Sequence, residues 1–309
     1  MANAPRVALF GECMLELQGE AFGTMRQAFG GDTLNTAVYL ARCAGPAVRA
    51  TYATGLGEDR LSDGLVQRWQ AEGLDVGLVR RVHGRTPGLY LIEVDASGER
   101  TFSYWRDQSA AKAYFDAPQT PLEEAAGRLD ALYLSGISLA ILPPAGRERL
   151  LALMRAMQAR GALVAFDNNY RPRLWAEPEE ARHWYAQAYA ASSLALITAD
   201  DEQALHALPA LEDAVTRALA LPTPEVVVKR GRLATLVRAG QAPVAEVPTL
   251  DVKPVDTTAA GDSFAGAYLA ARLAGRSPQE AAARGNQLAA RVIQHRGALI
   301  PREAMADLM

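Results

Sequence analysis

The stretch DTTAAGDSFAGAYLAARLAG, Asp256 to Gly275, decides the fold prediction because its small residues lead directly into an amphipathic helix. Phe264, Tyr268 and Leu273 recur near helical spacing, and Gly275 ends the pattern. Small residues at a helix start let a ligand approach bare backbone N–H groups, and the helix dipole adds partial positive charge there. The stretch is therefore a candidate phosphate-binding seat.

Asp262 is the carboxylate in the first turn of this helix. A carboxylate beside a phosphate seat repels the ligand unless the chemistry uses it. Near a transferring phosphoryl group it can accept the proton of the attacking hydroxyl. An acidic residue in a first turn is also an ordinary partner of the helix dipole, so both interpretations remain open at this point.

Outside this stretch, short and nearly all apolar runs alternate with helical segments, as in strands that are buried on both faces. The predicted strands are residues 6–12, 48–55, 130–136, 162–169, 194–198 and 225–231. This alternation predicts an α/β fold with a mainly parallel central sheet and helices on both faces. No linker or internal repeat divides the chain, and we expect one domain over residues 1–309.

Residues 86–106 break the pattern, because apolar and polar residues alternate there around the turn-rich centre DASGE. This predicts a β-hairpin with one face in water. The hairpin is either a lid over a binding site or an extension of the sheet edge.

Composition excludes several classes of partner. The 32 basic and 35 acidic residues give a net charge of −3, which provides no electrostatic footprint for nucleic acid or an anionic membrane. Cys13 and Cys43 make no disulfide framework, and the chain starts with a strand-like run rather than a signal sequence. No apolar run reaches ~20 residues. We expect a cytoplasmic protein, with homo-oligomerisation left open.

The motif DTTAAGD resembles the Asp-Thr-x-Gly-Ala-Gly-Asp signature of ribokinase-like, or phosphofructokinase B-type, carbohydrate kinases. The resemblance implies a three-layer ribokinase-like fold with a small β lid, and ATP and Mg²⁺ as cofactors. It also implies that Asp262 is the catalytic base and that Ala259, Ala260 and Gly261 form an anion hole. Ala259 stands where the family has glycine, which affects the local backbone geometry.

A second signature of the family, GGDTLNTAVYLAR at residues 30–42, lies near the N-terminus and implies sugar contacts from Gly31, Asp32 and Asn35. Within the family, the segments GECMLEL, FDNNYRPRLW and RGALIPREAM resemble those of bacterial 2-keto-3-deoxygluconate kinases, and the likeness covers nearly the whole chain. It implies ATP-dependent phosphorylation of 2-keto-3-deoxygluconate to its 6-phosphate.

The substrate of such a kinase carries a carboxylate, for which arginine is the bidentate partner. The resemblance implies that Arg106 and Arg171 hold the acid end, with Gly31 at its base and Tyr90 and Tyr104 over the substrate. A surface salt bridge remains the alternative for Arg171. Aromatic residues favour strands, so a hairpin core remains the alternative for the two tyrosines.

The resemblance also assigns the nucleotide side. The implied ATP contacts are Asn169, Lys229, Gly231, Ala260, Gly261, Ser263 and Asn286. An edge-strand solubiliser is the alternative for Lys229. The Asn-x-x-Glu motif of the family is expected near TADDEQ, but its asparagine is missing, and only an indirect Mg²⁺ contact through Glu202 is implied.

Three other functions are alternatives to this prediction. A kinase for another sugar, such as 2-keto-3-deoxygalactonate or fructose, is the main alternative, and the two arginines argue against a neutral sugar. A catalytically silent sugar-binding protein would most simply lack the base or the anion hole, and both are present. GDSFA nearly matches a hydrolase nucleophile elbow, but too few residues follow it for the rest of that fold.

Overall fold

The computed structural model describes residues 4–20, 22–94 and 100–308, and a nine-stranded sheet forms its centre. The strand order is β13-β12-β11-β10-β9-β8-β1-β4-β5. The strands are β1 (Arg6–Phe10), β4 (Arg49–Leu56), β5 (Asp75–Arg81), β8 (Ala131–Ser135), β9 (Leu163–Asp167), β10 (Leu194–Thr198), β11 (Glu225–Arg230), β12 (Leu233–Ala239) and β13 (Ala245–Val247). Along the order from β11 to β5, neighbouring strands pair in parallel, whereas β12 pairs antiparallel with both β11 and β13. Each run predicted as a strand is confirmed, with ends that differ by at most two residues.

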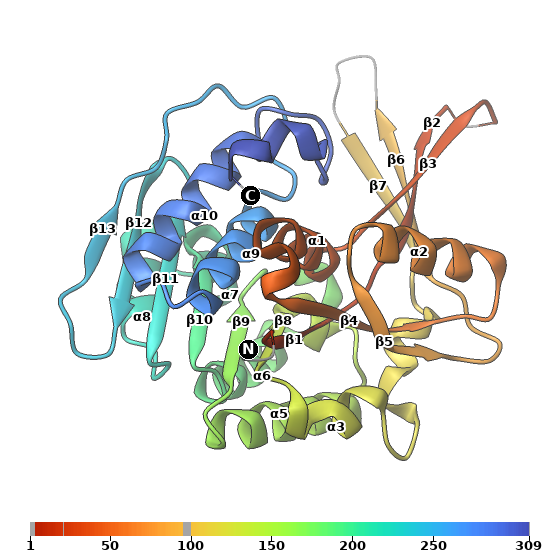
Figure 1. The fold of residues 1–309 in the computed structure, drawn as a ribbon, viewed down its shortest axis with the longest axis horizontal. Coiled ribbons are helices and arrows are strands. Elements are labelled where there is room, and N and C mark those ends of the chain that lie inside the picture. Colours follow the sequence, from red (N-terminus) through yellow and green to blue (C-terminus); the bar gives the residue numbers. More distant parts are fainter. Residues whose placement is uncertain (1–3, 21, 95–99, 309) are drawn as a thin grey trace.

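The sheet is buried on both faces, which explains why its strands are apolar throughout. In β1, Ala8 and Phe10 belong to one hydrophobic cluster, and Val7 and Leu9 belong to the other. Helices cover each face (Figure 1). On one face lie α1 (Asp32–Ala44), α2 (Arg60–Ala71), α9 (Ala260–Leu273) and α10 (Pro278–Val292); on the other lie α3 (Pro121–Ala125), α4 (Gly136–Ala140), α5 (Pro144–Ala159), α6 (Pro178–Ala190), α7 (Ala199–His206) and α8 (Leu211–Leu219). The predicted α/β layers are confirmed.

A second, four-stranded sheet has the order β3-β2-β6-β7 and rises beside α1 (Figure 1). Its strands are β2 (Met14–Gly19), β3 (Met25–Gly30), β6 (Gly88–Val94) and β7 (Arg100–Trp105). The predicted hairpin is the β6–β7 pair, in which Tyr90 faces Tyr104, and its turn at 95–99 lies outside the described residues. Because β6 pairs with β2, the hairpin does not extend the nine-stranded sheet.

The chain order places this second sheet at the carboxyl end of β1. Strands β2 and β3 lie between β1, which ends at Phe10, and α1, which begins at Asp32. Ligands of open α/β sheets bind beyond the carboxyl ends of the parallel strands. The second sheet therefore stands beside the edge at which a ligand site is expected.

Helices α1 and α9 approach each other closely because Gly266 has no side chain. A Cβ atom built on Gly266 would lie 2.6 Å from Cβ of Tyr39 and 2.9 Å from the backbone N of Leu40. The close approach fixes the N-terminal ends of the two helices relative to each other. These ends carry Asn35 and Asp262.

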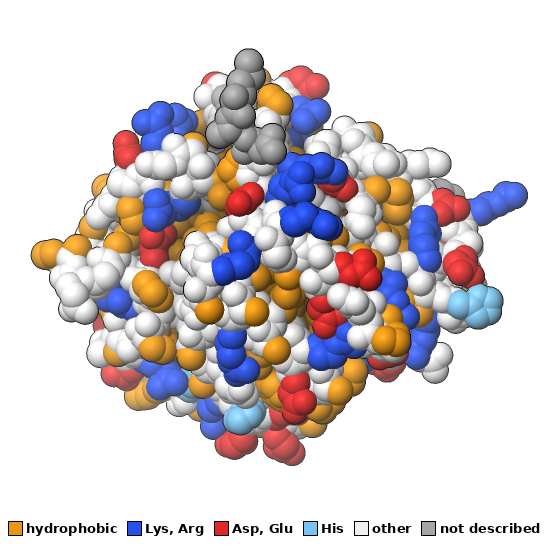
Figure 2. Space-filling model, turned by 60° about the horizontal axis from the view of Figure 1, so that its bottom comes forward, with side chains coloured by type: hydrophobic (Ala, Val, Ile, Leu, Met, Phe, Trp, Pro, Cys, Tyr) orange, Lys and Arg blue, Asp and Glu red, His pale blue; other side chains and the backbone are white. Residues whose placement is uncertain are grey.

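The surface shows no dominance of one charge on the face drawn in Figure 2, where Lys and Arg side chains are interspersed with Asp and Glu. Within the described residues, no helix has both the length and the apolar character that crossing a membrane requires. The location of the protein in the cytoplasm stays a prediction.

Two glycine substitutions test whether this helix contact controls the fold. Alanine is favoured over glycine inside a helix by roughly 0.8–1.0 kcal/mol, so Gly64→Ala in α2, where the new Cβ meets only the flexible end of Arg68, should stabilise the protein. Gly266→Ala should instead lower the unfolding midpoint in urea, because its Cβ collides with α1. A midpoint for Gly266→Ala at or above that of Gly64→Ala would contradict the close approach of the helices.

Candidate active site

The loop before α9 is held by Asp256, which belongs to the opening motif. One carboxylate oxygen of Asp256 accepts hydrogen bonds from the N–H and hydroxyl of Thr258 at 3.1 and 2.7 Å, and the other accepts from the N–H of Gly297 at 3.0 Å. Ala259 then adopts a left-handed conformation with φ of 60°, which is rare for a residue with a Cβ. Ala259, which stands where the family has glycine, is therefore the N-cap of α9 and has a strained backbone conformation.

The first turn of α9 retains open backbone donors. Among the described residues, no acceptor contacts the N–H groups of Gly261 and Asp262, whereas the N–H of Ser263 bonds to the carbonyl of Ala259 at 2.9 Å. The hydroxyl of Ser263 is buried and donates to the carbonyl of Ala260 at 3.0 Å. The free donors expected of an anion hole are present, but the side chain of Ser263 faces the helix.

Asp262, in the first turn of α9, faces α1, and the side-chain amide of Asn35 in α1 donates a hydrogen bond to it at 2.8 Å. Burial, together with the negative charges of Asp32 and Asp167, raises the pKa of Asp262 to about 7. The hydrogen bond from Asn35 and the charge of Lys229 act in the opposite direction. A carboxylate with such a pKa can take up a proton near neutral pH, which is what a general base requires.

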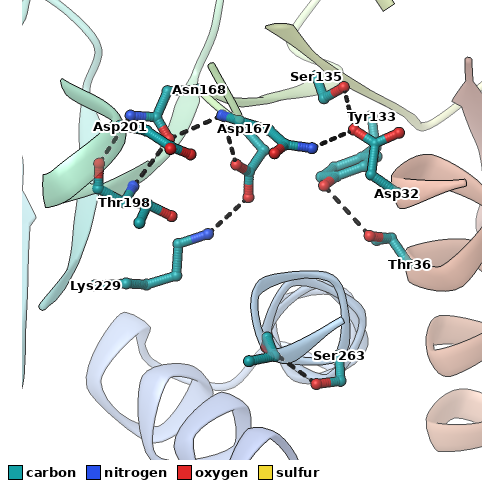
Figure 3. A network of polar contacts seen from close by, with 12 residues as sticks. Asp32, Thr36, Tyr133, Ser135, Asp167, Asn168, Thr198, Asp201, Lys229 and Ser263 are labelled. Carbon is teal, nitrogen blue, oxygen red and sulfur yellow. Dashed lines mark hydrogen bonds and ion pairs between the residues drawn. The ribbon is translucent and has the colours of Figure 1, made fainter. Parts of the chain in front are cut away.

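Side chains from several strand ends form a polar network beside the start of α9, where Ser263 is labelled (Figure 3). Asp32 accepts hydrogen bonds from the hydroxyl of Ser135 and the amide of Asn169, both at 2.5 Å. Lys229 donates to Asp167 at 2.8 Å in a largely buried ion pair. The competing interpretation of Lys229 as an edge-strand solubiliser is therefore wrong, because β11 lies inside the sheet.

Lys229 also lies close to the start of α9. Its Nζ is 3.5 Å from the position that a Cβ on Gly261 would occupy. A cation and two open N–H groups therefore face the same space. This combination of a point charge and directed donors suits a phosphate group.

The four-stranded sheet and the residues next to its strands contribute a second set of charged and aromatic side chains. Arg106 forms a buried ion pair with Glu12, and the hydroxyl of Tyr90 donates to Glu16. The ring centroids of Tyr90 and Tyr104 are 6.0 Å apart, and Tyr104 is 48% exposed. The rings thus lie side by side on one face of the hairpin.

Gly31, predicted at the base of the substrate, is the N-cap of α1. A Cβ atom on Gly31 would lie 2.2 Å from the carbonyl oxygen of Glu12. The backbone after β1 and the start of α1 therefore touch, which holds Gly31 and Arg106 in one region through Glu12.

Arg171 follows β9 and lies apart from Arg106. Its guanidinium donates to the carbonyl of Tyr170 at 2.8 Å and is 3.4 Å from the carboxylate of Asp201, and its side chain is 51% exposed. Within the described part of the chain, the two arginines have different ion-pair partners, Glu12 for Arg106 and Asp201 for Arg171. The predicted shared role of the two arginines at a substrate carboxylate stays a prediction.

Two predicted ATP contacts, Asn286 and Gly231, lie outside the polar network of Figure 3. Asn286 accepts from Thr235 at 2.8 Å and donates to the carbonyls of Val247 and Pro248, so its amide ties α10 to the sheet edge. Gly231 forms the turn after β11 with φ of 59°. The predicted adenine contact of Asn286 and the ATP contact of Gly231 stay predictions.

Glu202 is not brought to this site. It is buried in α7, where it accepts from the hydroxyl of Tyr189 at 2.9 Å and lies 3.4 Å from His206 and Arg217. Adjacent helix residues point about 100° apart, and it is Asp201 that faces the site. Burial raises the pKa of Asp201, with Asp167 adding to the effect and Arg171 opposing it.

The fold and this site define an α/β protein whose chemistry suits phosphoryl transfer to a hydroxyl. Residues 4–305 match the model of the pfkB family of carbohydrate kinases. The chain therefore belongs to this family, as the signature motifs implied.

Several individual proteins are similar to this chain. The 2-dehydro-3-deoxygluconokinase of Escherichia coli (strain K12) is 48% identical over 97% of this chain and 98% of its own length. The corresponding enzyme of Haemophilus influenzae is 41% identical over 98% of both chains. The crystal structure of 2-dehydro-3-deoxygluconokinase from Thermotoga maritima has a TM-score of 0.80 at 22% identity, covering 98% of this chain and 99% of that one.

The raised pKa of Asp262 predicts a cost in stability. A carboxyl group whose pKa is higher in the folded than in the unfolded chain stabilises the fold at low pH. This contribution is lost as pH rises from about 4, the unfolded value, through about 7. Asp262→Asn should therefore melt at a higher temperature than the parent protein at pH 8, by on the order of a few degrees.

The difference between the two melting temperatures should shrink as pH falls toward 4. Thermal unfolding of both proteins across this range is the measurement. An equal difference at pH 4.5 and pH 8, or a less stable variant at pH 8, would contradict the proposed burial of the charge.

Proposed function

We propose that this chain uses ATP to phosphorylate 2-keto-3-deoxygluconate, also called 2-dehydro-3-deoxygluconate, at its terminal hydroxyl. The observation that carries the proposal is 41–48% identity with curated 2-dehydro-3-deoxygluconokinases over nearly the whole chain. Arg106 and Arg171, the two arginines predicted to hold the acid end, support an acidic substrate because a neutral sugar needs no fixed cation.

In the proposed mechanism, Asp262 accepts the proton of the terminal hydroxyl. The hydroxyl oxygen forms a bond to the γ-phosphorus of ATP while the bond from that phosphorus to the β,γ-bridging oxygen breaks, and ADP leaves. The N–H groups of Gly261 and Asp262 and the charge of Lys229 stabilise the negative charge on the transferred group. Asn35 orients the base through its 2.8 Å hydrogen bond.

Each part of the proposed pocket has a separate role. The anion hole comprises the open N–H groups of Gly261 and Asp262 in the turn that starts at Ala259, because the N–H of Ala260 already bonds to the carbonyl of Thr257 at 3.3 Å. Asp32 holds the sugar from the start of α1. The hairpin, with Tyr90 and Tyr104, acts as a lid that excludes water from the transferred phosphate. Asn169 links the sugar and phosphate sides because it already contacts Asp32.

Mg²⁺ is the metal expected with ATP, and the carboxylates at this edge fit its preference for oxygen ligands. Asp167 and Asp201 are near enough for the charge of Asp167 to raise the pKa of Asp201, so a cation between them would relieve a repulsion. We assign these two residues, rather than Glu202, to hold the ion directly or through water. When bound, the ion would neutralise charge on the phosphates.

The base assignment predicts a pH profile. Because Asp262 has a pKa of about 7 and must be unprotonated to act, kcat/KM for the sugar acid should fall about tenfold per pH unit below that value. Initial rates between pH 5 and 8.5 test this. A profile that stays level down to pH 5.5 would show that Asp262 is not the titrating base.

Substrate choice and the base are tested together. ATP-dependent product formation should be much faster with 2-keto-3-deoxygluconate than with fructose or ribose, and Asp262→Asn should lose ~10²- to 10⁴-fold in kcat. Activity on neutral sugars alone would overturn the acidic substrate, and no activity on any of them would favour a silent binding protein.

Arg171→Lys should raise KM for the sugar acid about tenfold, because a point charge replaces a planar fork of donors. Arg173→Lys is the matched control, since Arg173 is exposed in the same loop. KM for ATP should change little in both variants. Equal KM values for the sugar acid in the two variants would remove Arg171 from the acid-binding role.

A further inference from the structure

Glu12 carries a buried carboxylate that the proposed mechanism does not use. It follows β1 directly, is 2% exposed, and gives one oxygen, Oε2, to the ion pair with Arg106. The other oxygen, Oε1, is buried and has no hydrogen-bonding partner among the described residues. An unsatisfied buried acceptor destabilises the fold, and a charged one does so more strongly, so a buried acceptor of this kind is usually paired with a ligand or water.

The position of this oxygen indicates the sugar pocket. Oε1 of Glu12 would lie 2.9 Å from a Cβ atom on Gly88, the first residue of β6, and the same strand carries Tyr90 two residues further on. The backbone of Glu12 touches Gly31. Oε1 of Glu12 therefore lies beside the segments that carry Gly31, Tyr90 and Arg106, the residues predicted to contact the substrate.

Two more polar atoms of this pocket are buried without a partner in the described part of the chain. They are the side-chain oxygen of Asn35 and the Nε of Arg106. With Oε1 of Glu12, they make two acceptors and one donor. A ligand that satisfies all three must bring two hydroxyl donors and one acceptor, and a hydroxylated sugar acid has these groups.

The order of the groups along the pocket assigns the hydroxyls. Asn35 is bonded to Asp262, the base at the terminal hydroxyl, whereas Glu12 is bonded to Arg106 at the acid end. In a 2-keto-3-deoxy acid, C3 has no hydroxyl, so the hydroxyl nearest the acid end of the open chain is on C4. We propose that Glu12 accepts a hydrogen bond from the C4 hydroxyl and is a specificity-determining residue of this pocket.

This inference rests on the proposed function and extends it. It makes Glu12 a reader of the C4 configuration, because a hydroxyl with inverted configuration points away from a fixed, buried oxygen. The rigid ion pair with Arg106 holds that oxygen in place. The alternative is that Glu12 serves only as the counterion that orients Arg106 toward the substrate carboxylate.

As a hydrogen-bond acceptor, Glu12 would interact with the C4 hydroxyl of the substrate; as a counterion of Arg106, it would affect only binding of the carboxylate. A double-mutant cycle that combines changes in the protein with changes in the substrate separates the two roles. The protein changes are Glu12→Gln and Glu12→Met. The substrate changes are the 4-deoxy analogue and the analogue in which the carboxylate is an amide. For each pair, kcat/KM is measured at saturating ATP.

The parent enzyme should lose about tenfold or more in kcat/KM when the C4 hydroxyl is removed, as expected for a hydrogen bond to a charged group. In Glu12→Met, which has no acceptor, removal of the same hydroxyl should cost less than twofold. Glu12→Gln, which keeps the shape but not the charge, should fall between them. The penalty for the amide analogue should stay similar in all three proteins.

The opposite coupling would overturn the proposal. If Glu12 only orients Arg106, both variants should lose sensitivity to the carboxylate and keep the full penalty for losing the C4 hydroxyl. Penalties that simply add in both cycles would also overturn it. Failure of the parent enzyme to phosphorylate 2-keto-3-deoxygluconate at all would be a failure of the proposed function instead.

Glu72→Gln is the matched control for loss of a buried ion pair. Glu72 forms a bidentate pair with the buried Arg42, which lies in the last turn of α1, whereas Gly31 and Asn35 lie at its start. It should lower the melting temperature without changing the penalty for either analogue. Each Glu12 variant is compared with the control at matched stability, so that partial unfolding is not mistaken for a change in specificity.

Discussion

The contact between α1 and α9 is the constraint on which the rest of the site depends. In the proposed function, α1 starts at the sugar side and α9 starts at the phosphate seat, so the distance between the helix starts would set the distance between the two substrates. Gly266 allows the helices to approach, and the hydrogen bond from Asn35 to Asp262 joins their first turns. The carboxylate proposed as the proton acceptor is thereby held between the starts of the two helices.

The same contact concentrates negative charge in a buried space. Asp32, Asp167 and Asp262 face one region, in which Lys229 is the neighbouring cation. Such a group of buried carboxylates destabilises the folded state when all of its members are charged. The same burial and repulsion raise the pKa of Asp262 to near neutrality. Stability and catalysis therefore depend on the same interactions, in opposite directions.

The sequence predicted six strands of the nine-stranded sheet, where burial on both faces made the strands apolar, as in β8 and β10. It missed β5, β12 and β13, which lie at the two ends of that sheet. It also missed β2 and β3 because MLELQG and MRQAFG mix apolar and polar residues, as strands with one exposed face do. The hairpin was located correctly, but its pairing with β2 depends on a contact more than 70 residues away in the chain. Local pattern carries no information on such a partner.

The candidate site divides in a similar way. The signature motif predicted Asp262 and the seat before α9, because a helix start is a local feature. Neither Glu12 nor Asp201 was singled out, since their surroundings are set by Arg106 and Asp167 from distant segments. A signal for both existed, because Glu12 is the last residue of the strand predicted at 6–12 and Asp201 follows the strand predicted at 194–198 by three residues.

Burial and the neighbouring carboxylates give Asp262 the pKa of a base at neutral pH. NMR titration of ¹³C-labelled aspartate carboxyl groups, in the ligand-free protein and in Asp262→Asn, tests this most directly. One resonance should titrate near pH 7 and be absent from the variant. Titration of every aspartate resonance of the parent protein below pH 5 would contradict the raised pKa of Asp262.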